Sequence, residues 1–524
     1  MPGDRKLGRH PHPGYAGAWM RLTVLPLLVL LASLSACGPK LCGPSSQVAS
    51  QAQLAPPITI GAPVSLDGHP TCAMLQAWLA AVDGDAGAKA LYAQYYAGRA
   101  DVPPAVDVLA DFSLLRYQSG GFVPRRIIDE ATCAVMAQRR VDGLWTNVRV
   151  GPVLDSPLNA ASPAVPEAED APVPRNDAER VAKIAALADW LMARDRFSGS
   201  IVVVHRGATI LARSWGLASR AYGVPNRVDT KFNLGSMNKM FTAVSILQLV
   251  EQHKVSLDDK AGKWLPDWPN ADVRDKVTVR MLLTHSSGLG SYWNEEFERR
   301  KVHIRAVADY FPTFASQPLQ FPPGARFSYS NAGFIVLGAI VEKVSGEDYF
   351  NYVRRHVYAP AGMTDSDCYD PWEDVPNLAV GYTRADPDGK LDFSRWHNNL
   401  FFITKGGPAG GGYSTSPDLV RFAAALLGGK LLRPATFATM SGKQIDVPIG
   451  PMAVRSLRNA GYGFGMGRSK VRGTLFIGHS GGAPGINSML NMSEDGQWIL
   501  AVMTNGEEGA NDLGQYIRDL ITRT

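Results

Sequence analysis

The sequence predicts an α/β protein of the α+β type, in which one antiparallel sheet is assembled from both ends of the C-terminal two thirds of the chain. Two observations lead to this fold class. A helical pattern precedes a strand hairpin at 201–215, and a second hairpin at 486–504 precedes a final helix. The stretch between the hairpins has mostly helical patterns, so we expect it to form a second, mostly helical lobe beside the sheet.

The elements at the two ends are expected from their residue patterns. Apolar residues recur at spacings of three and four in the first helix, and short turns around Gly207 and Gly496 separate the strands of each hairpin. In order, we expect a helix over 178–196, strands over 201–205 and 209–215, strands over 486–492 and 497–504, and a helix over 512–521.

The N-terminus has the layout of an export signal. Basic residues precede an apolar run over 22–34, and Ser35, Ala36 and Cys37 follow it. The segment 34–37 also resembles the lipobox of bacterial lipoproteins, which implies that Cys37 carries a lipid. We therefore expect residues 1–37 to be a signal peptide with a lipobox, and the protein to be exported to the periplasm or cell envelope and held on the membrane by its lipid. A plain cleaved signal is the alternative, and either Met1 or Met20 could be the start.

Two linkers divide the rest of the chain. Both are rich in small residues and proline. The block between them contains two helical patterns, over 74–82 and 88–96, and extended patterns over 134–138 and 145–150. The expected parts are a linker at 38–57, a small α+β accessory domain at 58–155, a proline-rich linker at 156–177 and a larger domain at 178–524.

Cysteine usage and charge limit the possible partners. Five cysteines are present, and their spacing matches no metal site. In an oxidising compartment Cys72 and Cys133 are the pair that we expect to bridge, because both fall in the accessory domain. The net charge of +5 comes without a long basic block, so we expect no nucleic-acid partner.

A serine and a lysine mark the first candidate site. Ser236 is expected at the start of an apolar helix over 240–250, and Lys239 returns to the same face three residues later. A hydroxyl becomes a strong nucleophile when a neighbouring group takes its proton. Ser-x-x-Lys is common by chance, and a capping serine followed by a surface lysine is the alternative interpretation.

Two further motifs follow in order. Tyr329-Ser330-Asn331 precedes an apolar helix over 334–341, and His479-Ser480-Gly481-Gly482 follows a short strand over 474–477. Together the three motifs resemble the active-site elements of the serine β-lactamase and penicillin-binding-protein superfamily, and within it the class C-like branch with family VIII-type esterases and D-aminopeptidases. The segments 277–289 and 410–419 also look like that branch.

The resemblance implies roles for these residues. Ser236 would be the nucleophile, Lys239 its electrostatic and proton-relay partner, and Tyr329 the general base with a pKa lowered by the lysine. Asn331 and His479 would contact the substrate. The backbone N–H of Ser236 and one near Gly481 or Gly482, on an edge strand, would form the oxyanion hole. The resemblance implies no metal and no cofactor.

His479 departs from the penicillin-binding pattern, which has lysine in that position. An ordinary imidazole has a pKa of about 6.5 and is mostly neutral above neutral pH, whereas a lysine stays charged. We therefore expect weak binding of β-lactam carboxylates, improving as pH falls, and a preference for neutral esters.

Two other motifs are interpreted as structural. Residues 478–482 fit the Gly-x-Ser-x-Gly elbow of α/β-hydrolases, but no histidine follows His479 and the next residues predict a hairpin. His285, in the segment Thr284-His285-Ser286, is expected to hold its loop by a hydrogen bond.

The function that the sequence predicts is an exported serine hydrolase that works through an acyl-enzyme. Small esters or D-amino-acid amides are the expected substrates. A D,D-peptidase or β-lactamase of the same fold is the enzymatic alternative, and a non-catalytic cell-envelope binding or sensor protein is the alternative of another class.

Overall fold

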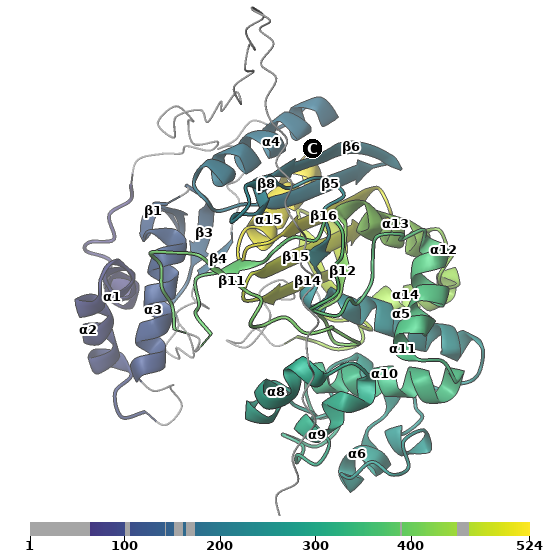
Figure 1. Cartoon of the computed structure of the whole chain (residues 1–524). Helices are drawn as coiled ribbons and strands as arrows, with labels where there is room; N and C mark the ends of the chain where they lie inside the picture. The colour runs from purple at the N-terminus through teal and green to yellow at the C-terminus, as the bar shows by residue number, and fades with distance from the viewer. Residues whose placement is uncertain are drawn as a thin grey trace, which may run out of the picture. The chain divides into compact units, whose positions relative to one another are not determined.

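The computed structural model describes residues 63–99, 105–141, 143–150, 161–163, 173–387, 390–447 and 461–523 (Figure 1). The predicted signal peptide with Cys37, and the linker at 38–57, lie outside the described residues. The described residues all belong to one compact unit. Among the helices of the described ranges, none is long and apolar enough to cross a membrane.

The N-terminal part consists of three helices and a four-stranded antiparallel sheet in the order β1-β2-β3-β4. The two predicted helices and the two predicted strands are present, while α3 and β1 were not predicted. The elements are α1 (Ala73–Asp83), α2 (Asp85–Tyr95), α3 (Ala105–Ser119), β1 (Phe122–Asp129), β2 (Ala134–Arg139), β3 (Trp145–Val148) and β4 (Ala161–Pro163).

Strand β4 corrects one predicted boundary. It lies inside the range 156–177 that we assigned to the linker, and it pairs with β3 through Val148–Ala161 and Thr146–Pro163. Because β4 is the last strand of this sheet, Pro163 can join it without breaking a ladder on both sides. The accessory sheet therefore continues past residue 155.

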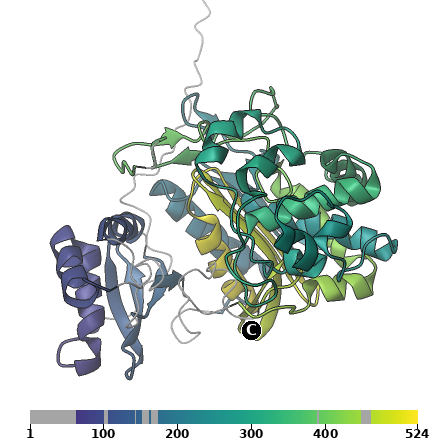
Figure 2. The ribbon, with the colours of Figure 1, turned by 90° about the horizontal axis from the view of Figure 1, so that it is seen from below.

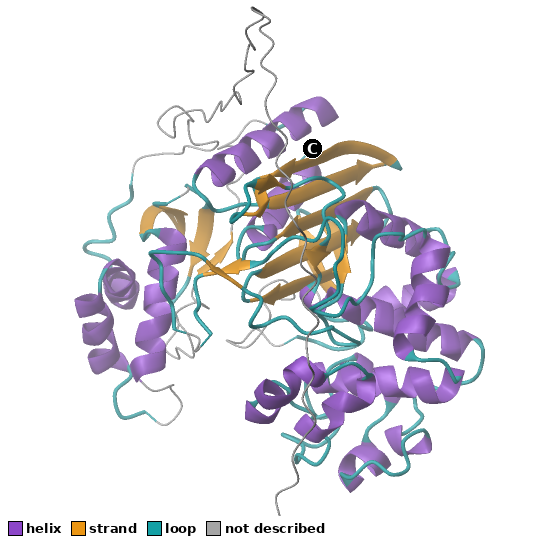
Figure 3. Ribbon diagram, viewed as in Figure 1, coloured by secondary structure: helices purple, strands orange, loops and turns teal. Residues whose placement is uncertain are grey.

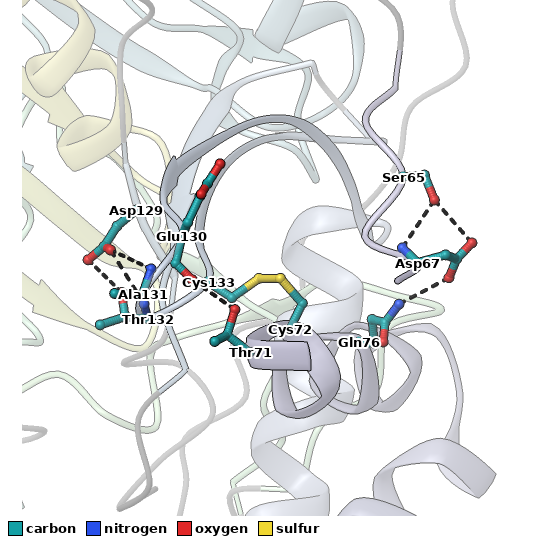
Figure 4. Close-up of a disulfide and its surroundings, with 10 residues drawn as sticks. All are labelled: Ser65, Asp67, Thr71, Cys72, Gln76, Asp129, Glu130, Ala131, Thr132 and Cys133. Carbon is teal, nitrogen blue, oxygen red and sulfur yellow. Dashed lines mark hydrogen bonds between the residues drawn. A yellow bond between two sulfur atoms is a disulfide. The ribbon is translucent and has the colours of Figure 1, made fainter. Parts of the chain in front are cut away.

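The disulfide Cys72–Cys133 confirms the predicted pair (Figure 4). It joins the start of α1 to the turn between β1 and β2, where the Thr71 hydroxyl also donates to the Glu130 carbonyl at 2.8 Å. Helices and sheet of this part enclose a core of their own, in which Trp78 is fully buried.

The main sheet has six antiparallel strands in the order β13-β14-β15-β16-β5-β6 (Figure 3). The predicted hairpins from the two ends of the domain lie side by side, because β16 pairs with β5 along its whole length. The strands are β5 (Gly199–His205), β6 (Ala208–Trp215), β13 (Gly467–Val471), β14 (Thr474–Ala483), β15 (Ile486–Ser493) and β16 (Trp498–Thr504).

The two faces of this sheet contribute to different cores. In β5, Ile201 and Val203 pack with helices α4 (Asp177–Ala193) and α15 (Ala510–Thr522), whereas Val202 and Val204 belong to the larger core with the helical lobe. This alternation is the two-residue period of a strand that is buried on both faces. The sheet thus has helices over each face (Figure 1).

The helical lobe lies between the hairpins in sequence, as predicted (Figure 2). Its two most buried helices, α5 and α10, pack against each other. The helices are α5 (Asn238–Glu251), α6 (Ala271–Lys276), α7 (Val279–Leu283), α8 (Glu295–Arg300), α9 (Phe311–Phe314), α10 (Asn331–Ser345), α11 (Tyr349–Val353), α12 (Ala359–Ala361), α13 (Ser416–Leu427) and α14 (Pro434–Ser441).

Short strand pairs complete the described structure. Two of the pairs join segments close in sequence, whereas β9 and β12 join segments far apart in the chain. The pairs are β7 (Leu217–Ser219) with β8 (Val224–Pro225), β9 (Phe232–Asn233) with β12 (Tyr413–Ser414), and β10 (Tyr382–Thr383) with β11 (His397–Asn398).

Candidate active site

Ser236 lies on a single 3-10 turn, Gly235–Met237, that leads directly into α5. The turn is held close to β14, and Gly235 has a φ of +49°. A Cβ at Gly235 would lie 2.9 Å from the backbone nitrogen of Gly482. Only glycine adopts this positive φ freely and leaves room for the backbone of Gly482. Gly235 therefore allows the turn to hold Ser236 beside the backbone of β14.

Lys239 is fully buried beneath this turn. Its Nζ lies 3.1 Å from Oγ of Ser236 and 2.8 Å from Oδ1 of Asn331, and it also donates to the carbonyl of Ala409. Burial lowers the pKa of Lys239 well below its ordinary value, because the surroundings disfavour the charged form. An amine that can lose its proton therefore contacts the serine hydroxyl.

Tyr329 and Asn331 lie where a loop enters α10. Ser330 caps the helix by accepting the Gly333 N–H at 2.9 Å. The Tyr329 ring lies over the Lys239 amine, 4.9 Å from Nζ to the ring centre. The structure thus brings together all four residues that the Ser-x-x-Lys and Tyr-x-Asn motifs predicted.

The pKa of Tyr329 differs from our expectation. We expected the lysine to lower it, whereas burial of the phenol raises the pKa above its ordinary value, and a hydrogen bond with Ser236 acts in the opposite, weaker sense. The phenolate is costly in these surroundings. Tyr329 is therefore set up as a neutral hydroxyl, which can donate a proton.

His285 holds the loop that carries Tyr329. Its carbonyl accepts the Ser328 N–H at 2.8 Å, and its Nδ1 accepts the Ser330 N–H at 3.0 Å. The bonds fall on either side of Tyr329, whose ring centre lies 4.3 Å from that of His285. The predicted structural role of His285 is confirmed.

Strand β14 carries the His-Ser-Gly-Gly motif within its length, and not after its end as predicted. Its partner β13 reaches only to Gly478, whereas β15 follows β14 to Ala483. A Cβ at Gly481 would lie 2.0 Å from the carbonyl oxygen of Leu234, so glycine is required for the strand to approach the nucleophile turn. Gly482 lines the cavity next to Ser236.

His479 is buried behind the site, with 5% of its surface exposed. Its Nδ1 must donate to the Ser480 carbonyl, so its Nε2 is an acceptor, 3.2 Å from Oη of Tyr462. His285 accepts at Nδ1, so its Nε2 donates to the same Oη at 3.2 Å. Tyr462 therefore links two neutral imidazoles in one directed chain.

This chain corrects the expectation for His479. The burial of His479, helped by the charge of Lys239, lowers its pKa to about 3, far from the ordinary value that we assumed. His479 is also not among the residues that line the cavity. The sequence offered no signal for Tyr462, which lies far from His285 in the chain.

A cavity of about 200 Å³ opens beside Ser236. Its wall includes the catalytic-motif residues Ser236, Tyr329 and Asn331, and it has no charged side chain among its lining residues. Aromatic residues that sequence reasoning missed form much of the remainder: Tyr292, Trp293, Phe297 and Phe402. They come from loops and a short helix, which have no periodic pattern that would have marked them.

The Gly-x-Ser-x-Gly segment is not an α/β-hydrolase elbow. Ser480 is in the middle of β14, paired with Met489 of β15. An elbow serine lies at a turn between a strand and a helix. The structure therefore excludes this interpretation, as the sequence predicted.

Comparison with known proteins assigns the chain to a family. A beta-lactamase family profile matches residues 183–522, which include every catalytic-motif residue described above. The chain belongs to the beta-lactamase family. In enzymes with the Ser-x-x-Lys motif the serine is the nucleophile that becomes acylated. Ser236 of that motif lines the cavity in this chain, as family membership leads one to expect. The protein is a serine hydrolase with the β-lactamase and penicillin-binding-protein fold.

Among the relatives of this beta-lactamase family protein are penicillin-binding proteins and an esterase. The chain is 29% identical to penicillin-binding protein 4* of Bacillus subtilis, over 62% of this chain and 72% of the relative. It is 30% identical to esterase EstB of Burkholderia gladioli, over 55% of this chain and 79% of the esterase. The solved structure of a penicillin-binding protein from Bacillus halodurans superposes with a TM-score of 0.54 at 30% identity. The match covers 62% of this chain and 96% of that structure.

Proposed function

We propose that this protein is an esterase-type hydrolase that forms an acyl-enzyme on Ser236. One observation carries the proposal: the Ser236 hydroxyl lies in the wall of the cavity and 3.1 Å from the buried amine of Lys239. Small neutral esters are the preferred substrates, and D-amino-acid amides are the second class that we expect it to accept.

The contacts support a complete proton path. In the neutral form, Lys239 donates to Asn331 and Ala409 and accepts the Ser236 proton, so that every group keeps a partner. Ser236 Oγ attacks the ester carbonyl as its proton moves to Lys239 Nζ. The backbone N–H groups of Ser236 and Gly482 hold the oxyanion. Tyr329 donates its proton to the leaving alkoxide and regains one from the Lys239 ammonium, so that no phenolate remains. Water then attacks the acyl carbonyl as its proton moves to Lys239, and the acid leaves as that proton returns to Ser236 Oγ.

The lining of the cavity supports neutral substrates. β-Lactams and D-alanyl peptides bear a carboxylate, and a charged hydrogen bond to such a group is worth about 1.5 to 3 kcal/mol. The cavity lining has no cation, and His479 is buried and neutral. Aromatic side chains favour an apolar acyl group instead. The likeness to an esterase adds to this preference.

Export is the second part of the proposal. The disulfide Cys72–Cys133 suits an oxidising compartment outside the cytoplasm. We infer that residues 1–37 direct export and that a lipid on Cys37 holds the protein at the membrane.

A labelling experiment and a substrate panel test the proposal. The purified protein is incubated with a fluorophosphonate probe and its intact mass is measured, with Ser236→Ala as the control. Short p-nitrophenyl esters, a chromogenic cephalosporin and D-alanyl amides are then compared by kcat/KM. We expect one adduct on the wild type and none on Ser236→Ala. Among the substrates, we expect the short esters to have the highest kcat/KM. No adduct on the wild type would favour the non-catalytic binding protein, and cephalosporin first would favour a β-lactamase.

A further inference from the structure

The loop over 390–404, called here the cavity loop, connects the active site to the N-terminal part of the chain. At its C-terminal end Phe402 lines the cavity, and its ring centre lies 5.2 Å from that of Trp293, which also lines the cavity. At its N-terminal end Phe393 stacks on Tyr117 of α3, with ring centres 4.3 Å apart and planes within 14°. The cavity loop thus contacts both the active-site cavity and helix α3.

The contact around Tyr117 is built from several groups. The guanidinium of Arg384, next to the loop, donates from Nε to the Tyr117 hydroxyl at 2.7 Å and lies 3.7 Å from the ring centre of Trp396. On the other side, Arg196 donates to the Tyr117 carbonyl at 2.7 Å. Through Tyr117, helix α3 therefore contacts both the cavity loop and the body of the hydrolase domain.

The loop between these ends is fixed to the strand that carries the oxyanion residues. Asn399 is buried, and its side-chain amide donates to the Pro484 carbonyl at 2.9 Å, just after β14. Its carbonyl accepts the Phe402 N–H at 2.9 Å. His397 and Asn398 of the loop also pair with β10, and the Asn399 N–H donates to the Gly381 carbonyl at 2.9 Å. The segment from Phe393 to Phe402 is therefore held together as one hydrogen-bonded unit, through which a displacement at Phe393 would reach Phe402.

We propose that the N-terminal part sets the shape of the acyl-binding cavity through the stack of Tyr117 on Phe393, so that Tyr117 is a positioning residue for substrates that reach Phe402. The positioning role of Tyr117 rests on the proposed function only in its predicted effect on ester kinetics. Tyr117 touches neither substrate nor the reacting atoms, so its effect is expected on KM for esters with large acyl groups and not on kcat for acetyl esters.

Hydrogen exchange and kinetics of four variants test this. In Tyr117→Ala we expect amides at 399–402 to exchange about tenfold faster, the effect of losing a ring stack and a hydrogen bond. KM for a phenylacetyl ester should rise several-fold while kcat for an acetyl ester stays unchanged. Phe393→Ala should have the same effect, and the double variant should add nothing. Tyr117→Phe should restore most of the wild-type behaviour.

Arg139→Met is the matched control. Arg139 of β2 pairs with Asp512 of α15 at 2.6 Å and thus also joins the N-terminal part to the hydrolase domain, through an ion pair that includes no residue of the cavity loop. We expect unchanged exchange at 399–402 in this variant. Equal effects of Arg139→Met and Tyr117→Ala, additive effects of Tyr117→Ala and Phe393→Ala, or unchanged exchange in Tyr117→Ala would each overturn the proposal. The exchange result stands even where no ester is hydrolysed, so the two proposals fail separately.

Discussion

At the scale of single residues, the proposed activation of Ser236 depends on the charge of Lys239. Three oxygens surround its Nζ, and an ammonium could donate to all of them. Burial, however, disfavours that charge, and no carboxylate is among these contacts to stabilise it. The neutral amine accepts the proton of Ser236 while it keeps its two other bonds. The lysine is therefore a better base here than Tyr329, whose phenolate is also disfavoured.

The rate should depend on pH through Lys239. The active form has the neutral amine, so kcat/KM for an ester should rise with pH and reach a plateau. Because burial lowers the pKa, the midpoint of this rise should fall well below the ordinary lysine value of about 10.4. A pH profile of kcat/KM measures it.

Lys239→Arg provides the control, since a guanidinium does not lose its proton at these pH values. We expect a loss of at least about a hundredfold and no remaining rise with pH. A variant that keeps the wild-type profile would remove Lys239 from the proton path.

His479 should not respond to pH in the range where an ordinary histidine does. With a pKa near 3, it stays neutral between about pH 8 and about pH 6. The ratio of kcat/KM for a chromogenic cephalosporin to that for a short ester should then be flat over this range. An imidazole of pKa about 6.5 would instead change its protonated fraction about twentyfold. A rise of the ratio approaching that size at low pH would contradict the buried position of His479.

At the scale of elements, the approach of β14 to the nucleophile turn sets the geometry of the site. Gly481 faces the Leu234 carbonyl, and Ser488 of β15 donates its hydroxyl to the same carbonyl at 2.8 Å. This fixes the distance between the Ser236 turn and the backbone of Gly482. The backbone groups that we propose for the oxyanion hole are thus positioned by a sheet strand and by the turn that leads into α5.

Gly481→Ala should separate these two elements. The added Cβ would meet backbone oxygen at 2.0 Å, so the strand must shift. We expect a loss of about 1 to 3 kcal/mol in the free energy of unfolding, the usual cost of overpacking, and a clear loss of ester turnover.

Gly482→Ala is the matched control, because a Cβ there has its nearest neighbour at 3.9 Å and the N–H remains. Its stability should stay within about 0.5 kcal/mol of the wild type. Denaturant melts and kinetics of both variants provide the test. Equal stability of the two proteins would show that the strand tolerates the shift.

The sequence predicted best the elements with strong local periodicity. Both hairpins and the helices α4 and α15 were found because strand alternation and helical spacing are local properties. β14 was predicted too short, since Gly478 and the glycines after Ser480 resemble a turn when their partners are unknown. Strand β4 was taken as linker because alanine, serine and proline dominate its surroundings.

The motifs predicted which side chains meet, but not their surroundings. Ser236, Lys239, Tyr329 and Asn331 are in contact as the ordered motifs indicated. The chain from His285 through Tyr462 to His479 depends on contacts between distant segments, and no local pattern contains it. The pKa values that we expected for His479 and Tyr329 were wrong because burial sets both values, and burial also depends on contacts between distant segments.

At the scale of the whole molecule, attachment to a membrane depends on the N-terminal segment. No helix in the described ranges could span a bilayer. The expected anchor is a lipid on Cys37, which lies outside those ranges, and each buried methylene of such a chain contributes about 0.8 kcal/mol to membrane binding. If that lipid is the anchor, its removal should be enough to release the protein.

Cys37→Ala should therefore move the protein from the membrane to the soluble fraction, while folding and ester turnover stay unchanged. Cys42→Ala is the matched control, because it removes a cysteine five positions further on, outside the segment that resembles a lipobox. That variant should stay with the membrane. Fractionation of cells that produce each protein, followed by immunoblotting, measures the partition. If Cys37→Ala and the wild type partition alike, the lipid anchor is wrong and a plain cleaved signal is the better account of residues 1–37.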